Sequence, residues 1–203
     1  MTRLPVGKAG HRPGGRWPAA VAAALLLVLV TGCAGTTTAE NQAGTGFIGG
    51  ETLTRYAPEE RQPAPVVSGP ALSGRGTVTT AAYRGKVIVI NIWGSWCAPC
   101  RQEAPDLAAA SKDTAKTAAF VGINIRDYRP ETARAFVRAF RVPYPHIYDP
   151  DGRELLKFAG TVPPNGIPTT LVLDTQGRIA VRVVGVISRA TLVDIVRDTE
   201  QGR

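Results

Sequence analysis

The chain has 203 residues, with 24 lysines and arginines against 16 aspartates and glutamates, and therefore a formal net charge of +8. No basic run with interleaved aromatics occurs, so this charge does not favour a nucleic-acid-binding protein. Its cysteines, Cys33, Cys97 and Cys100, are too few for a small fold held together by several disulfides. The protein must therefore fold around an apolar core.

Residues 1–32 have the pattern of a secretory signal peptide. Residues 1–16 contain four basic residues and no acidic one, and removing them halves the net charge. The apolar run 19–30 that follows suits a signal peptide but is short for a membrane-spanning helix. The run ends in Thr31, Gly32 and Cys33, which resembles a bacterial lipobox. We therefore expect Cys33 to be lipidated and to anchor the protein on the extracytoplasmic face of the cell membrane. The alternative is an uncleaved anchor helix in which Cys33 has no role.

Residues 33–64 are rich in Gly, Thr, Ala and Glu and show little apolar periodicity. We interpret them as a flexible tether, which spans roughly 30 Å on average at this length. Residues 65–203 then form one domain of ordinary size.

Apolar runs and turn signals predict the elements of this domain in chain order. A hairpin occupies 66–72 and 76–80, and a wholly apolar strand follows over 87–93. A helix extends from Pro99 to about Ala119, with Pro105 bending it or offsetting its start. The remaining elements are a strand over 120–125, a helix over 130–140, a strand over 146–148, a helix over 153–158, a hairpin over 169–174 and 178–184, and a helix from Ser188. Apolar strands alternating with helices indicate an α/β sheet covered on both faces.

The most informative motif is the pair Cys97 and Cys100, which follows the apolar strand and opens the next helix. Structural zinc needs a second ligand pair, but the only histidines are His11 and His146. Haem attachment needs a histidine directly after Cys100, where Arg101 stands. A structural disulfide at this spacing closes too small a loop to stabilise much. Redox chemistry is therefore the favoured interpretation.

The helix start assigns different roles to the two cysteines. Cys97 should lie at the helix N-terminus, where the helix dipole stabilises its thiolate, and is the expected attacking thiol. Cys100 lies one turn further in, should be more buried, and would resolve the mixed disulfide. Trp96 shields the site or simply packs.

These residues resemble the thioredoxin superfamily and, within it, the membrane-tethered TlpA/ResA-like branch. The matching segments are 91–100, the helical Pro105, the segment 166–174 and the pair Val184 and Gly185. The resemblance covers about residues 65–200. It implies a thioredoxin fold with a central mixed β-sheet flanked by helices, an N-terminal β-hairpin, and a central helix–strand insertion within 126–160.

The resemblance also assigns roles to individual residues. Pro99 belongs to the cysteine motif, and Pro168 matches a cis-proline that faces the two sulfurs. The backbone of Ile167 would then be available to pair with an extended substrate segment. Asn91 stands where many thioredoxins have a buried aspartate.

Asp127 corresponds to an acidic residue that is thought to assist the buried cysteine in this branch. It is shorter than the glutamate that the branch often has. Asp127 could instead be a solvated loop residue or a cap for the helix that starts near Pro130.

The implied activity is that of an extracytoplasmic thiol–disulfide oxidoreductase without metal or cofactor beyond the Cys97–Cys100 disulfide. By family likeness, we expect a reductase of exported protein disulfides, for example in cytochrome c maturation, which receives electrons from a membrane protein. The alternatives are a disulfide-forming oxidant, a thiol peroxidase, and a copper chaperone that binds through Cys97, Cys100 and His146.

Overall fold

The computed structural model describes residues 45–48 and 51–203 of the chain. The predicted signal peptide, Cys33 and the first part of the predicted tether lie outside these residues. Within the described part, no helix combines the length and the apolar character needed to cross a membrane.

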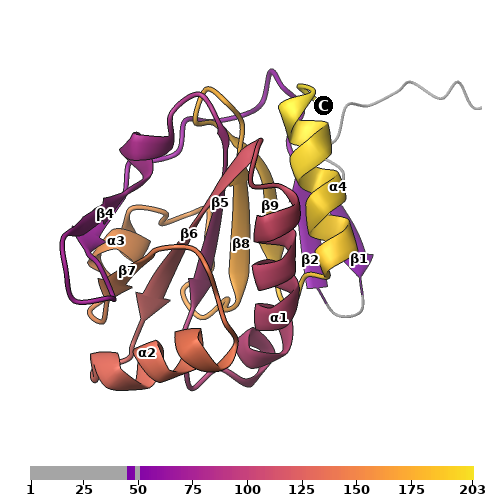
Figure 1. Ribbon diagram of the computed structural model, residues 1–203. Helices are drawn as coiled ribbons and strands as arrows, with labels where there is room; N and C mark the ends of the chain where they lie inside the picture. The colour runs from indigo at the N-terminus through magenta and orange to yellow at the C-terminus, as the bar shows by residue number, and fades with distance from the viewer. Residues whose placement is uncertain (1–44, 49–50) are drawn as a thin grey trace, which may run out of the picture. The chain divides into compact units, whose positions relative to one another are not determined.

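A mixed sheet forms the centre of the described domain, with seven strands in the order β1-β2-β9-β8-β5-β6-β7 (Figure 1). Strands β5 (Val87–Trp93), β6 (Ala118–Ile125) and β7 (His146–Asp149) are parallel. Strands β8 (Thr169–Leu173), β9 (Ile179–Val184), β2 (Glu51–Arg55) and β1 (Thr45–Ile48) continue the sheet as antiparallel neighbours. The C-terminal ends of β5 and β6 therefore lie along one end of the strands, and the C-terminal end of β8 lies at the opposite end.

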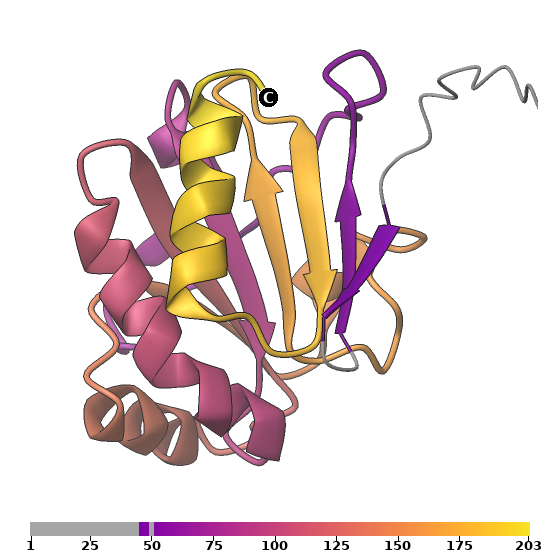
Figure 2. The ribbon, with the colours of Figure 1, turned by 90° about the vertical axis from the view of Figure 1, so that its right-hand side faces the viewer.

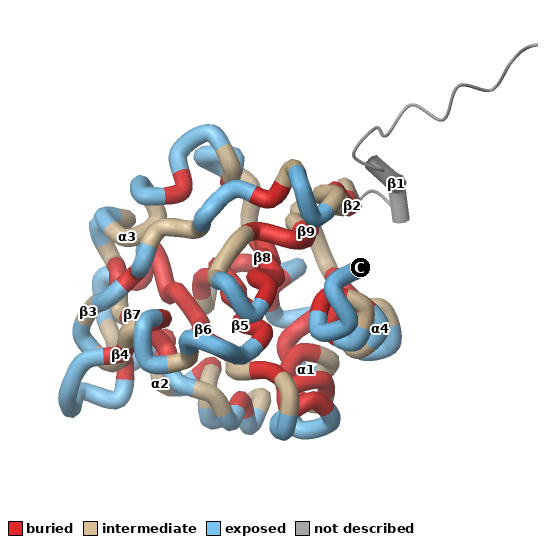
Figure 3. Tube along the Cα trace, turned by 90° about the horizontal axis from the view of Figure 1, so that it is seen from above, coloured by how far each residue is buried: buried red, intermediate tan, exposed pale blue. Residues whose placement is uncertain are grey.

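Two helices cover one face of the sheet, α1 (Ala98–Asp113) and α4 (Arg189–Glu200), which lie side by side in Figures 1 and 2. Alternation along β5 decides which residues meet them. Val87 and Val89 pack in one core with Leu107 of α1 and Leu192 of α4. The central strands are buried, and most of the exposed residues lie in loops and on the outer faces of helices (Figure 3).

The other face of the sheet receives Ile88, Ile90 and Ile92 of β5. It is covered by a small second sheet, β3 (Ser68–Pro70) with β4 (Thr77–Thr79), by the 3-10 helix η1 (Thr80–Tyr83), and by the segment around α3 (Arg153–Leu156). Helix α2 (Pro130–Ala139) packs through Phe136 on Trp93, with ring centroids 4.3 Å apart. The predicted thioredoxin-type layers, hairpin and helix–strand insertion are all present.

The predicted tether is wrong at its C-terminal end, because the folded domain begins before residue 65. Strand β2 pairs with β9, with Leu53 opposite Val183, and Leu53 is buried in the core. Arg61 is also buried, and Pro63 forms a bridge with Arg178. Sequence periodicity missed β2 because its pairing partner is about 130 residues away and it contributes a single apolar side chain.

The predicted end of the first helix and the predicted lengths of the first hairpin strands also differ from the structure. Helix α1 ends at Asp113 rather than near Ala119, because Ala118 and Ala119 pair with Val87 and Ile88 as the first residues of β6. The two strands of the predicted hairpin over 66–72 and 76–80 are three residues each, and they form a separate sheet. The predicted helices and strands from residue 120 onward lie where expected, to within two residues.

Candidate active site

Cys97 and Cys100 form a disulfide at the start of α1, with their Cα atoms 5.3 Å apart. Cys97 is the N-cap residue of this helix, and its sulfur accepts a hydrogen bond from the Cys100 backbone N–H at 3.2 Å. Pro99 lies in the first helical turn, where the missing N–H costs nothing. The unpaired N–H groups and the dipole of a helix N-terminus favour a thiolate at the Cys97 position.

The exposure of the two sulfur-bearing residues follows the expected order, although both are buried. Cys97 retains 5% of its surface and Cys100 retains 1%. Cys97 is therefore the more accessible of the two residues. Trp96 is 51% exposed beside them, so it forms part of the surface that a partner would touch.

Gly94 allows the tight loop that carries Trp96 and Cys97. A Cβ atom at position 94 would lie 2.7 Å from Nε1 of Trp96, which is closer than real contacts allow. The Cys97 backbone N–H also donates to the Gly94 carbonyl at 3.2 Å. A glycine here thus lets the indole fold over the backbone that leads to the disulfide.

The predicted cis-proline is present: the peptide bond between Ile167 and Pro168 is cis. The Ile167 side chain packs against the cluster that contains Cys97 and Cys100. Its backbone N–H donates to the Asn165 carbonyl at 3.1 Å, and the Pro168 carbonyl accepts from Gly185 at 2.9 Å. The N–H group of Ile167 is therefore already engaged within its own loop.

Asp127 is neither solvated nor the N-cap of α2. It is 5% exposed, and Arg129 is the N-cap residue of that helix. Its carboxylate accepts hydrogen bonds from the Ser95 N–H at 2.8 Å, the Ser95 hydroxyl, the Asn124 amide at 2.7 Å and the Thr132 hydroxyl at 3.1 Å. Asp127 thus ties the loop directly before Cys97 to β6 and α2, and Cys100, the buried cysteine that the resemblance suggested it assists, is not among its hydrogen-bond partners.

Glu103 is a site residue that sequence analysis missed. It lies one turn after Cys100, is 1% exposed, and accepts hydrogen bonds from the Asn91 amide at 2.8 Å and the Ile187 N–H at 3.3 Å. Burial first, and the Glu103 carboxylate second, raise the pKa of Tyr144. The signal was available, because position 103 falls between Cys100 and Leu107 on the inner face of the helix.

His146 does not join the cysteines in a ligand set. Its Nδ1 accepts a hydrogen bond from Nε1 of Trp93 at 3.2 Å, and burial lowers its pKa to about 3. Among the residues that the structure describes, no group of three His, Cys, Asp or Glu is arranged to hold a metal ion. The ring of His146 therefore supports Trp93 beneath the site.

A family model described as the AhpC/TSA family matches residues 61–182. The chain belongs to this family. The chain is 34% identical to the thiol:disulfide interchange protein HelX of Rhodobacter capsulatus over 123 residues. These residues make up 60% of this chain and 66% of HelX. The chain thus spans about two thirds of that relative.

Two solved structures of related proteins extend over most of the domain. A DsbF homologue from Corynebacterium diphtheriae has a TM-score of 0.69 and 36% sequence identity, covering 75% of this chain and 96% of its own. A secreted thiol-disulfide isomerase from Corynebacterium glutamicum has a TM-score of 0.68 and 32% identity, with the same coverage. These neighbours confirm the thioredoxin fold and place this AhpC/TSA family member among thiol–disulfide oxidoreductases.

Proposed function

We propose that this protein is an extracytoplasmic thiol–disulfide oxidoreductase that reduces disulfides in exported proteins. The observation that carries the proposal is the Cys97–Cys100 disulfide at the N-terminus of α1, next to the loop of the cis peptide before Pro168. The names of the relatives support the same chemistry.

The cycle follows from the positions of the two sulfurs. In the dithiol form, the Cys97 thiolate attacks one sulfur of a substrate disulfide, and the other substrate sulfur leaves as a thiolate that takes up a proton. Cys100 loses its proton and attacks Sγ of Cys97, which releases the second substrate thiol and leaves the Cys97–Cys100 disulfide. Two electrons have then passed to the substrate, and no redox group besides the cysteine pair takes part.

The disulfide must be reduced again by a dithiol donor. We propose a membrane electron-transfer protein as this donor, with lipidated Cys33 keeping the domain near it. Exported proteins whose cysteines must stay reduced, as in cytochrome c maturation, are the proposed substrates. The same pair run in reverse would form disulfides, and titration against glutathione measures which direction its potential favours.

The activity is tested with a disulfide substrate such as insulin and a dithiol donor. We expect Cys97→Ser to lower turnover by at least about a thousandfold, because the attacking thiolate is lost. Cys33→Ser is the matched control, since it removes a cysteine outside the pair and should leave turnover unchanged. Full activity of the Cys97→Ser protein would disprove the proposal.

The substrate class is tested with a Cys100→Ala variant, which cannot resolve the mixed disulfide. We expect exported cysteine-containing proteins to be trapped on Cys97. Rapid consumption of hydrogen peroxide by the wild-type protein would instead favour a thiol peroxidase, and a copper-dependent absorption spectrum of the reduced protein would favour a copper chaperone.

A further inference from the structure

A cavity of about 510 Å³ lies between the β3–β4 hairpin, helix α2 and the start of β7. Buried or half-buried apolar side chains form part of its wall, including Leu72, Val78, Val137 and Tyr144. Cavities of this size with a mainly apolar lining are typical of sites for small molecules.

Three arginines and no acidic residue line this cavity. Arg75 lies in the hairpin turn, and Arg134 and Arg138 are one turn apart on α2. Like charges at this helical spacing repel each other, so an anion between them is favoured. His146 also lines the cavity, but burial lowers its pKa to about 3, so the positive charge comes from the arginines.

Two of the three arginines, Arg75 and Arg138, have side chains that are available to bind an anion. Arg134 is oriented by donating from Nε to the Leu72 carbonyl at 2.6 Å, and it also lies 3.6 Å from the exposed Glu131 carboxylate. The side chains of Arg75 and Arg138 are exposed and make no hydrogen bond or ion pair with the described residues 51–203. Planar guanidinium groups match the geometry of a carboxylate.

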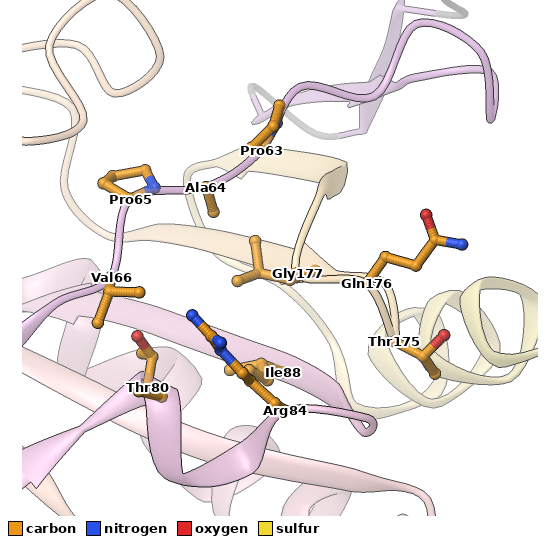
Figure 4. Close-up of a pocket in the computed structure, with 12 residues that line it drawn as sticks. Pro63, Ala64, Pro65, Val66, Thr80, Arg84, Ile88, Thr175, Gln176 and Gly177 are labelled. Carbon is orange, nitrogen blue, oxygen red and sulfur yellow. The ribbon is translucent and has the colours of Figure 1, made fainter.

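A second cavity shows what this arrangement adds. The cavity of about 320 Å³ in Figure 4 lies beside the start of β5 and is lined by one charged side chain, Arg84. This cavity has room for a small molecule but has no group of charged side chains that would favour an anion. The cavity at α2 combines an apolar wall with three cations, and this combination selects a class of ligand.

We propose that the cavity between the β3–β4 hairpin and α2 binds a small amphipathic carboxylate, whose apolar body packs on Leu72, Val137 and Tyr144 while its carboxylate meets Arg75 and Arg138. Leu72, Val137 and Tyr144 also pack against the cluster that contains both cysteines. The cavity therefore shares wall residues with the core that contains the redox pair, and Trp96 is not among its lining residues.

The proposal is tested by calorimetry on the full-length protein with 4-phenylbutyrate, at constant ionic strength. We expect one molecule to bind with a Kd on the order of 1 mM, as for a ligand of this size, and the neutral 4-phenylbutyramide to bind at least about tenfold more weakly. Equal affinity for the acid and the amide, or no saturation by about 20 mM acid, would overturn the proposal.

Variants locate the carboxylate. Arg75→Gln and Arg138→Gln together should weaken binding of 4-phenylbutyrate by about tenfold or more, because two charge-assisted contacts are lost. Arg153→Gln, which removes the same charge from an exposed arginine outside the cavity, should change Kd by less than about twofold. If Arg153→Gln weakened the binding of 4-phenylbutyrate as much as the double variant does, the anion would be attracted by the overall positive charge, and the proposed site would be wrong.

A second readout separates a loss of binding from a loss of structure. Both the double variant and the Arg153→Gln control should keep the disulfide reductase rate of the wild-type protein, because none of these arginines belongs to the redox machinery. The amide resonances of Leu72 and Val137 should shift on addition of 4-phenylbutyrate to the wild-type protein. Shifts confined to residues outside the cavity would overturn the assignment.

Discussion

Two buried aspartates, Asp127 and Asp174, each stand one or two residues after a central strand, yet they serve opposite ends of the sheet. Asp127 follows β6, which is parallel to β5, and therefore lies at the end where β5 leads to the cysteines. Asp174 follows β8, which is antiparallel to β5, and lies at the other end, where the C-terminus is found (Figure 1). The direction of the strand decides which aspartate supports the redox site.

Their partners differ as well. Asp174 accepts hydrogen bonds from nitrogen donors alone, from Arg61, Gln176 and Arg178, and it forms ion pairs with both arginines. Asp127 accepts from hydroxyl groups at one oxygen and from nitrogen donors at the other. A hydroxyl can either donate or accept, whereas an N–H group only donates. The two sites should therefore respond differently to the same change.

The largest effect is expected for Asp174→Asn. Each carboxylate oxygen faces N–H donors, so the new amide NH₂ meets another donor, and both ion pairs are lost. We expect the free energy of unfolding to fall by about 3 kcal/mol, with the reductase rate of the folded protein unchanged. Urea unfolding and the insulin assay measure the two. A large loss of activity at full stability would contradict the assignment of Asp174 to the fold.

Acid should lower the free energy of unfolding through His146 before it does so through Asp174. Burial lowers the pKa of His146 from 6.5 to about 3, so between these values the unfolded chain binds a proton that the folded protein does not. Stability therefore falls as the pH drops below about 6.5, by about 1.4 kcal/mol per pH unit. Between pH 7 and 4.5 the loss amounts to about 2.5 kcal/mol.

The control for this pH dependence is His146→Gln, which should flatten it in urea unfolding whatever its effect on stability at pH 7. Asp174 does not contribute in this range. Burial raises its pKa, but the hydrogen bonds of Arg178 and Gln176 and the charge of Arg178 outweigh burial and lower the pKa below 3.8. Its stabilisation is present above 3.8 and is lost only as the pH falls through that lowered value. An unchanged slope in the His146→Gln protein would show that another group titrates.

Asp127 offers a pair of variants that separates its negative charge from its hydrogen bonding. Asp127→Ala removes the acceptor of the Ser95 and Asn124 N–H groups, and should cost about 2 kcal/mol and about tenfold in reductase rate. Asp127→Asn should cost less than about 1 kcal/mol, because the hydroxyls of Ser95 and Thr132 can accept from the new amide. If the reductase rate falls equally in both variants, the negative charge of Asp127 contributes to the rate, and its hydrogen bonds to the Ser95 loop do not explain the loss alone.

The smallest effect is expected for Ser95→Ala. The hydroxyl contact to Asp127 is lost, but the Ser95 backbone N–H still donates to the same carboxylate at 2.8 Å. We expect a loss of about 1 kcal/mol in urea unfolding and a reductase rate within about twofold of the wild type. A loss as large as that of Asp127→Ala would show that the side chain of Ser95 holds the loop.

Local sequence patterns predicted the features whose causes are local. The apolar run of β5 and the Cys97–Cys100 spacing predicted a strand, a helix start and a redox pair. The cis peptide before Pro168 was expected only from the family resemblance. β2 was missed because it depends on pairing with the distant β9. Glu103 was missed because an acidic residue on an inner helix face is ordinarily unfavourable, whereas in the structure it accepts hydrogen bonds from Asn91 and Ile187.

The sequence by itself indicated the chemistry of this protein, because two cysteines at one helix start, without the further ligands that zinc or haem would need, favour a reversible disulfide. Only the tertiary structure decided which polar residues support that chemistry. Asp127 and Asp174 both follow apolar strands in the sequence. Whether β6 and β8 are parallel or antiparallel to β5 places one aspartate beside the loop of Cys97 and the other beside the C-terminus, and strand direction is set by long-range pairing.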